Sequence, residues 1–153
     1  MKFGFSTICA DEDAMQQLGF TLSQQLLPGT LVFLNGELGA GKSILARAII
    51  HAAGYVGRVK SPTYTLIESY DIKSPATAIA RIAHLDFYRL SDPDEFYHLG
   101  FDDVLGQHDL VMIEWPEKAI EYLPSATVNI VIDYLPAEAR NVTVKSTTDV
   151  RAK

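Results

Sequence analysis

Eight consecutive residues in the first third of the chain constrain its fold more than any other segment. They read Gly36-Glu37-Leu38-Gly39-Ala40-Gly41-Lys42-Ser43, the pattern of the phosphate-binding P-loop, or Walker A motif. Gly36 and Gly41 permit a turn tight enough to wrap the backbone around a phosphate, with its N–H groups pointing inward. Lys42 supplies a cation for the β- and γ-phosphates, and Ser43 offers a hydroxyl to Mg²⁺. The segment therefore predicts a nucleotide-binding site.

The flanking residues favour the same conclusion. Residues 30–35, before the motif, form a short apolar run typical of a buried strand, and residues 44–50, after it, continue as a helix that ends at Gly54. The N-terminal end of such a helix adds a partial positive charge to the anion site. Strand, glycine-rich loop and helix in this order predict an α/β P-loop fold.

Length and composition bound the remaining possibilities. The chain has 153 residues, of which 48% are hydrophobic and 21% charged, and this predicts one domain over 1–153 with a single core. The net charge of −6 argues against a surface that binds nucleic acid phosphates over its whole area, although work on nucleic acid through a partner remains open. No apolar run is long enough for a membrane span, no secretory signal is recognisable, and Cys9 is the single cysteine. We therefore expect a cytoplasmic protein.

The rest of the chain alternates between apolar strands and amphipathic helices. Apolar residues at three- and four-residue spacing predict a helix that begins at the acidic residues 11–13 and extends to Leu26. A turn separates two predicted strands, one ending near residue 70 and one at 78–85, and this arrangement predicts a hairpin. The sheet is therefore expected to be mixed, with a parallel core and antiparallel flanking strands. The other predicted elements are strands at 1–8, 109–114, 126–133 and 141–146, helices at 92–99 and 116–122, and a frayed end from about residue 147.

Hydrolysis of a nucleotide requires a metal-binding carboxylate and a group that orients water. Two buried-type strands end in an acid, Asp86 and Glu114, and ligands of α/β sheets bind outside the carboxyl ends of strands. Either acid can hold Mg²⁺ while the other orients the attacking water. The alternative for each is an acid that only caps the following turn.

Several neighbouring residues have two possible roles. Thr63 and Thr65 lie in a proline-containing loop after the P-loop helix, where nucleotide-sensing loops commonly occur, although a local turn explains them equally well. His84 is expected to be a core histidine because it lies inside a strand pattern. Trp115 can cover the site or the core, and Arg89 can contact phosphate or partner or remain solvated.

Five segments occur together, and their combination is more specific than the P-loop alone. They are Gly-Glu-Leu-Gly-Ala-Gly-Lys-Ser (36–43), Val-Lys-Ser-Pro-Thr-Tyr-Thr-Leu (59–66), His-Leu-Asp-Phe-Tyr-Arg-Leu (84–90), Asp-Pro-Asp-Glu-Phe (92–96) and Ile-Glu-Trp-Pro-Glu (113–117). This combination resembles the TsaE family, small bacterial ATPases required for threonylcarbamoyl-adenosine in tRNA. The resemblance covers about residues 10–140.

The resemblance implies a P-loop fold and ATP hydrolysis with Mg²⁺, coupled to the partner proteins TsaB and TsaD, with TsaD performing the transfer to adenosine 37 of tRNA. The chain would contact tRNA only indirectly, through this complex. Ser43 and Glu114 would ligate Mg²⁺, and Asp86 would act near the γ-phosphate together with Lys42. The residues implied to contact the nucleotide are Asp11, Gly39, Ala40, Gly41, Lys42, Ser43, Ile44 and Arg140.

The residues also allow functions from two other classes. A small-molecule kinase closes an arginine-rich lid over the phosphates, and no arginine cluster occurs between Arg81 and Glu114. A regulatory module would bind nucleotide without hydrolysing it. No arginine finger is expected within the chain itself, so turnover in the absence of partners is expected to be slow.

Overall fold

A computed structural model describes residues 3–147 of the chain, and predictions that concern residues 1–2 and 148–153, including most of the frayed end, lie outside them. One sheet contains seven strands in the order β1-β7-β6-β2-β5-β4-β3. The strands are β1 (Gly4–Cys9), β2 (Thr30–Gly36), β3 (Ile67–Asp71), β4 (Arg81–Asp86), β5 (Leu110–Glu114), β6 (Val128–Tyr134) and β7 (Arg140–Ser146). Strands β6, β2, β5 and β4 pair in parallel, whereas β1, β7 and β3 pair antiparallel with their neighbours. The expected α/β fold with a parallel core and antiparallel flanks is confirmed.

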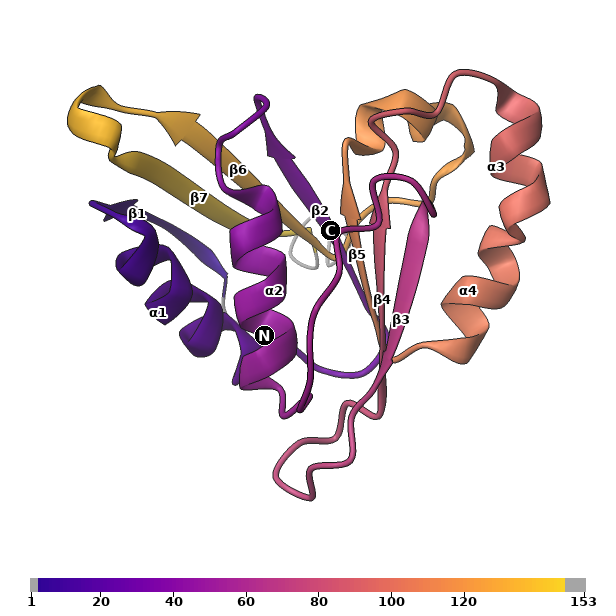
Figure 1. Cartoon of the computed structure of the whole chain (residues 1–153), viewed down its shortest axis with the longest axis horizontal. Helices are drawn as coiled ribbons and strands as arrows, with labels where there is room; N and C mark the ends of the chain where they lie inside the picture. The colour runs from indigo at the N-terminus through magenta and orange to yellow at the C-terminus, as the bar shows by residue number, and fades with distance from the viewer. Residues whose placement is uncertain (1–2, 148–153) are drawn as a thin grey trace.

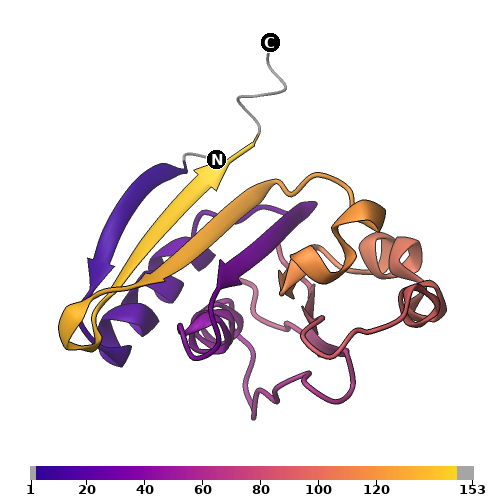
Figure 2. The ribbon, with the colours of Figure 1, turned by 90° about the horizontal axis from the view of Figure 1, so that it is seen from above.

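Helices cover both faces of this sheet. On one face, α1 (Glu12–Ser23) and α2 (Lys42–Ala52) lie side by side (Figures 1 and 2). The other face is covered by α3 (Pro93–Leu99), α4 (Phe101–Gln107) and the 3₁₀ segment η1 (Pro116–Tyr122). Each face therefore has its own apolar core, and the inner strands β2 and β5 contribute to both. A strand buried on both faces reads as a continuous apolar run, which explains the sequence of β2.

Local signals explain where several elements begin and end. Asp11 accepts a hydrogen bond from the backbone N–H of Ala14 at 2.9 Å and so caps α1. Asp92 caps α3 in the same way, with Pro93 in the first turn. Gly100 ends α3 with a φ of 67°, a left-handed conformation that glycine adopts at little cost.

The structure differs from the sequence-based expectations at four elements. Helix α1 ends at Ser23 instead of Leu26, because the chain turns there before β2, although Leu26 still packs into the core. Helix α4 was not predicted; Gly100 redirects the chain, and Phe101 and Val104, three residues apart, form its buried face. The strand expected from residue 78 begins at Arg81, and the segment 116–122 is 3₁₀ with a break at Ala119.

No helix within residues 3–147 is long and apolar enough to cross a membrane.

Candidate nucleotide-binding site

The P-loop connects β2 to α2 at the carboxyl edge of the parallel strands. Gly39 and Gly41 have φ angles of 80° and 114°, in the left-handed region that side chains rarely adopt. Gly41 stands at the N-cap of α2 and therefore provides no side-chain cap. The first-turn N–H groups of α2 are thus available to an anion, which is the arrangement that binds phosphate at helix N-termini.

The outer side of the P-loop is held by the hairpin of β6 and β7. The hydroxyl of Tyr134 donates to the carbonyl of Leu38, and Nε of Arg140 donates to the carbonyl of Ala40 at 3.1 Å. The guanidinium of Arg140 also lies over the Tyr134 ring, 4.4 Å from its centroid. These bonds hold the carbonyls of Leu38 and Ala40 against the hairpin.

Lys42 folds back over its own loop. Its ammonium group donates to the carbonyl of Gly36 and, at 3.2 Å, to that of Glu37. The same group lies 3.9 Å from the centroid of the Trp115 ring. Burial lowers the pKa of Lys42, while the nearby carboxylates, Glu114 first, act to raise it. Trp115 has a φ of 57°, an uncommon backbone conformation for a bulky residue.

The hydroxyl of Ser43 meets the carboxylate of Glu114. Oγ of Ser43 donates to the two carboxylate oxygens at 2.9 and 3.1 Å. Glu114 ends β5 and is only 3% exposed. On its other side, Oε2 of Glu114 lies 2.6 Å from Nε2 of His84, so the carboxylate is held between α2 and β4.

Asp86 ends β4 next to Glu114, because these two residues pair across the parallel strands. It accepts a hydrogen bond from the backbone N–H of Tyr88 at 2.9 Å. Burial raises the pKa of Asp86, and the Tyr88 N–H opposes that rise; the Glu114 charge raises the pKa further. The two acids identified from the strand ends therefore stand side by side.

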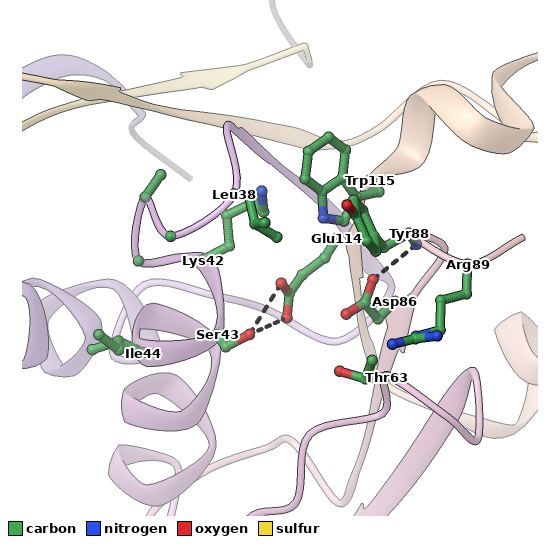
Figure 3. A pocket seen from close by; sticks show the side chains of 13 residues that line it. Leu38, Lys42, Ser43, Ile44, Thr63, Asp86, Tyr88, Arg89, Glu114 and Trp115 are labelled. Atoms are coloured by element: carbon green, nitrogen blue, oxygen red, sulfur yellow. Dashed lines mark hydrogen bonds between the residues drawn. The ribbon is translucent and has the colours of Figure 1, made fainter.

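These groups open into one pocket of about 440 Å³ at the edge of the sheet (Figure 3). Its lining consists of Leu38, Gly39, Ala40, Gly41, Lys42, Ser43, Ile44, Thr63, Asp86, Tyr88, Arg89, Glu114 and Trp115. The structure thus brings Lys42, Ser43, Asp86 and Glu114 together. A second, neighbouring pocket is lined by Asp11 and Arg140. Four residues line both pockets: Gly39, Ala40, Gly41 and Ile44.

The residues with two possible roles are now placed. Thr63 lines the pocket, whereas the hydroxyl of Thr65 donates to Glu68 at 2.8 Å. His84 is buried, as expected of a core histidine, but it also contacts Glu114. Sequence reasoning did not identify that contact, although the two-residue spacing to Asp86 places both on one face of the strand.

Arg89 lines the pocket. Of the alternatives open for Arg89, this position agrees with a contact to phosphate, although no arginine finger was expected within the chain. The loop that leaves β4 after Asp86 brings it there, and its guanidinium carbon lies 4.6 Å from the centroid of the Tyr64 ring. A cation in cis is therefore available at this pocket.

Comparison with known proteins gives one consistent result. The family described as "Threonylcarbamoyl adenosine biosynthesis protein TsaE" matches residues 9–142. The protein named tRNA threonylcarbamoyladenosine biosynthesis protein TsaE of Haemophilus influenzae is 39% identical over 145 residues, covering 92% of this chain and 88% of its own. The protein of that name from Rickettsia felis is 36% identical, covering 87% of this chain and 75% of its own.

A solved structure shares the fold. The crystal structure of Bacillus subtilus YdiB superposes with a TM-score of 0.73 and covers 98% of this chain and 90% of its own, at 21% identity. The family match spans most of the chain, and it includes the P-loop and both acidic strand ends. This chain belongs to the TsaE family of threonylcarbamoyl adenosine biosynthesis proteins.

Proposed function

We propose that this protein binds ATP with Mg²⁺ in the P-loop pocket and hydrolyses it to support threonylcarbamoyladenosine formation in tRNA. The observation that carries the proposal is the meeting of four groups in one pocket: the P-loop with Lys42, the Ser43 hydroxyl, and the carboxylates of Asp86 and Glu114. Phosphoryl transfer depends on positioning and electrostatic stabilisation, which are the contributions that such groups make.

The donors at Ser43 and Glu114 fit magnesium. Mg²⁺ prefers oxygen ligands and is usually bound by one or two carboxylates together with substrate phosphates and water. The Ser43 hydroxyl and the Glu114 carboxylate are oxygen donors already within hydrogen-bond distance of each other. They would hold the ion, which when bound supplies positive charge to the β- and γ-phosphates.

The chain itself would bind and orient the triphosphate. Lys42 would leave the carbonyls of the P-loop and the Trp115 ring, its present partners, and donate to phosphate oxygens. Asp86 is supported by the Tyr88 N–H and would accept a hydrogen bond from the attacking water. Arg89 at the rim would add a further positive charge near the phosphates.

We propose TsaB and TsaD as the partners and the cytoplasm as the location. Membership of the family supports a place in this pathway, and tRNA would be reached through the partner complex. Thr63 lies in the 61–66 loop and also in the pocket wall. This loop would therefore sense the γ-phosphate and alter how the partners are held. Hydrolysis by the protein alone would be weak and would rise with the partners.

Reconstitution tests the proposal. Modified tRNA per TsaB–TsaD complex is measured over many turnovers, with and without this protein, ATP and Mg²⁺, while free phosphate is measured in parallel. We expect repeated turnover and phosphate release only with all components present. Phosphate appearing on a metabolite would instead favour a kinase, and nucleotide-dependent binding without phosphate release would favour a regulatory module.

A further inference from the structure

His84 lies in the middle of β4 and is 1% exposed. Its Nε2 atom lies 2.6 Å from Oε2 of Glu114. The same carboxylate oxygen accepts the hydroxyl of Ser43 at 2.9 Å. One oxygen of Glu114 therefore has a partner on each side, one from the sheet and one from the P-loop helix. A buried carboxylate with two such partners has little freedom to rotate.

The second ring nitrogen indicates which atom carries the proton. Nδ1 of His84 is buried and has no hydrogen-bond partner among residues 3–147. A buried N–H donor without an acceptor is rare in native proteins, whereas an unpaired acceptor is less so. Glu114, as an ionised carboxylate, can only accept. The arrangement thus favours a proton on Nε2 that is donated to Glu114.

We propose that His84 is the positioning residue for Glu114, directing its carboxylate toward Ser43 and the magnesium position. This inference rests on the proposed function, in which Ser43 and Glu114 hold the ion. Groups that hydrogen-bond to metal-binding side chains orient them, and their loss typically reduces metal affinity about 10–100-fold. His84 does not line the pocket, so it would reach the magnesium position through Glu114.

The environment of Glu114 shows why a positioning group is needed. Its charge is close enough to Lys42 to act on the pKa of that ammonium group. Without the His84 bond, Oε2 would be a buried carboxylate oxygen that has lost a partner. The carboxylate would then be free to turn away from the Ser43 hydroxyl, which would weaken the magnesium position and leave the other phosphate contacts in place.

The test compares two substitutions of similar size. His84→Gln keeps an N–H donor at about the reach of Nε2, and His84→Leu removes it. His108→Leu is the matched control, because His108 is also buried and bonds Ser69 and the Val104 carbonyl, outside the pocket. For each protein, binding of a non-hydrolysable ATP analogue is measured as Mg²⁺ is titrated, and again without Mg²⁺. In the metal-free wild type, nitrogen NMR of His84 identifies the protonated ring atom.

In His84→Leu, we expect the Mg²⁺ concentration that gives half of the increase in affinity for the ATP analogue to rise about 10–100-fold. The affinity for the analogue without Mg²⁺ should be unchanged. His84→Gln and His108→Leu should need the wild-type concentration, and NMR should show the proton on Nε2. If His84→Leu does not fold, His84→Asn, polar but too short to reach Glu114, takes its place.

Three results would overturn the role of His84: an Nε2 atom without a proton, a wild-type Mg²⁺ requirement in His84→Leu, or no rescue in a folded His84→Gln protein. A wild-type protein whose nucleotide binding ignores Mg²⁺ would overturn the proposed function as well. The two failures are therefore distinguishable.

Discussion

The ammonium group of Lys42 lies 3.9 Å from the centroid of the Trp115 ring. A cation over an aromatic face is stabilised by about 0.5–2 kcal/mol, and the loop carbonyls of Gly36 and Glu37 hold the same group. Lys42 must give up these contacts to reach a phosphate. Lys42 is therefore held by partners within the protein that a phosphate would have to replace.

Tryptophan fluorescence should report this movement, because Trp115 is the single tryptophan of the chain. We expect ATP with Mg²⁺ to change the emission as Lys42 leaves the ring. Lys42→Met should alter the emission of the free protein and abolish the response. A Lys42→Met protein with wild-type emission and a full response to ATP would contradict the movement.

Replacing Asp86 should separate stability from activity. Because burial raises the pKa of Asp86 in the folded state, folding is favoured by Asp86 at acid pH, and this contribution is lost as pH rises from the unfolded pKa through the folded one. Asp86→Asn keeps an acceptor for the Tyr88 N–H without the charge. At neutral pH we expect the free energy of unfolding to rise by about 0.5–2 kcal/mol and ATP hydrolysis to be lost.

Urea unfolding at two pH values measures this effect. The increase in the free energy of unfolding caused by Asp86→Asn should become smaller as the pH falls toward the pKa of a carboxyl group in the unfolded chain. A variant less stable than wild type at neutral pH, or one that still hydrolyses ATP at the wild-type rate, would be inconsistent with the role given to Asp86.

The bond between Tyr134 and Leu38 should matter for nucleotide affinity. Tyr134→Phe removes the donor to the Leu38 carbonyl while keeping the ring beneath Arg140. A neutral hydrogen bond contributes about 0.5–1.5 kcal/mol, so the dissociation constant for ATP should rise about 2- to 12-fold. Tyr97→Phe serves as the control, because Tyr97 lies in α3 and lines a separate pocket that contains no residue of the P-loop. Equal affinities in both variants would show that the bond does not shape the loop.

The packing of α1 on α2 requires glycine at position 19. A Cβ atom there would lie 2.5 Å from Cβ of Ala48, so Gly19→Ala should destabilise the fold by about 1–3 kcal/mol. Adding Ala48→Gly should recover part of this loss in a double-mutant cycle.

The glycine of α4 gives the opposite expectation. A Cβ on Gly106 meets nothing within 4 Å, and Gly106→Ala should stabilise the fold by about 0.5–1 kcal/mol. Chemical denaturation measures the free energy of unfolding of each variant. A Gly19→Ala protein as stable as wild type would refute the close contact between α1 and α2.

Sequence alone located the groups that carry strong local signals. The P-loop has a fixed pattern, and its place between a strand and a helix was predicted correctly. Asp86 and Glu114 were identified because each ends an apolar strand, and parallel strands place their carboxyl ends at one edge. In the structure β4 and β5 are neighbours, and their register pairs these two acids.

The remaining features depend on contacts between distant segments. Arg140 and Tyr134 reach the P-loop from a hairpin about a hundred positions later, and no local pattern shows where such a hairpin lies. The bond of His84 to Glu114 likewise depends on strand pairing and burial. Helix α4 has a weak sequence signal, because its buried face consists of Phe101 and Val104 and because Gly100 before it is a residue typical of a helix end.

Titration calorimetry of ATP and Mg²⁺ into the purified protein tests the proposed site most directly. We expect binding heat with a stoichiometry of one nucleotide per chain. This heat should be lost in Lys42→Ala, and in Ser43→Ala and Glu114→Gln it should no longer depend on Mg²⁺. The absence of any binding heat in the wild-type protein, unchanged when TsaB and TsaD are added, would contradict nucleotide binding at the P-loop pocket.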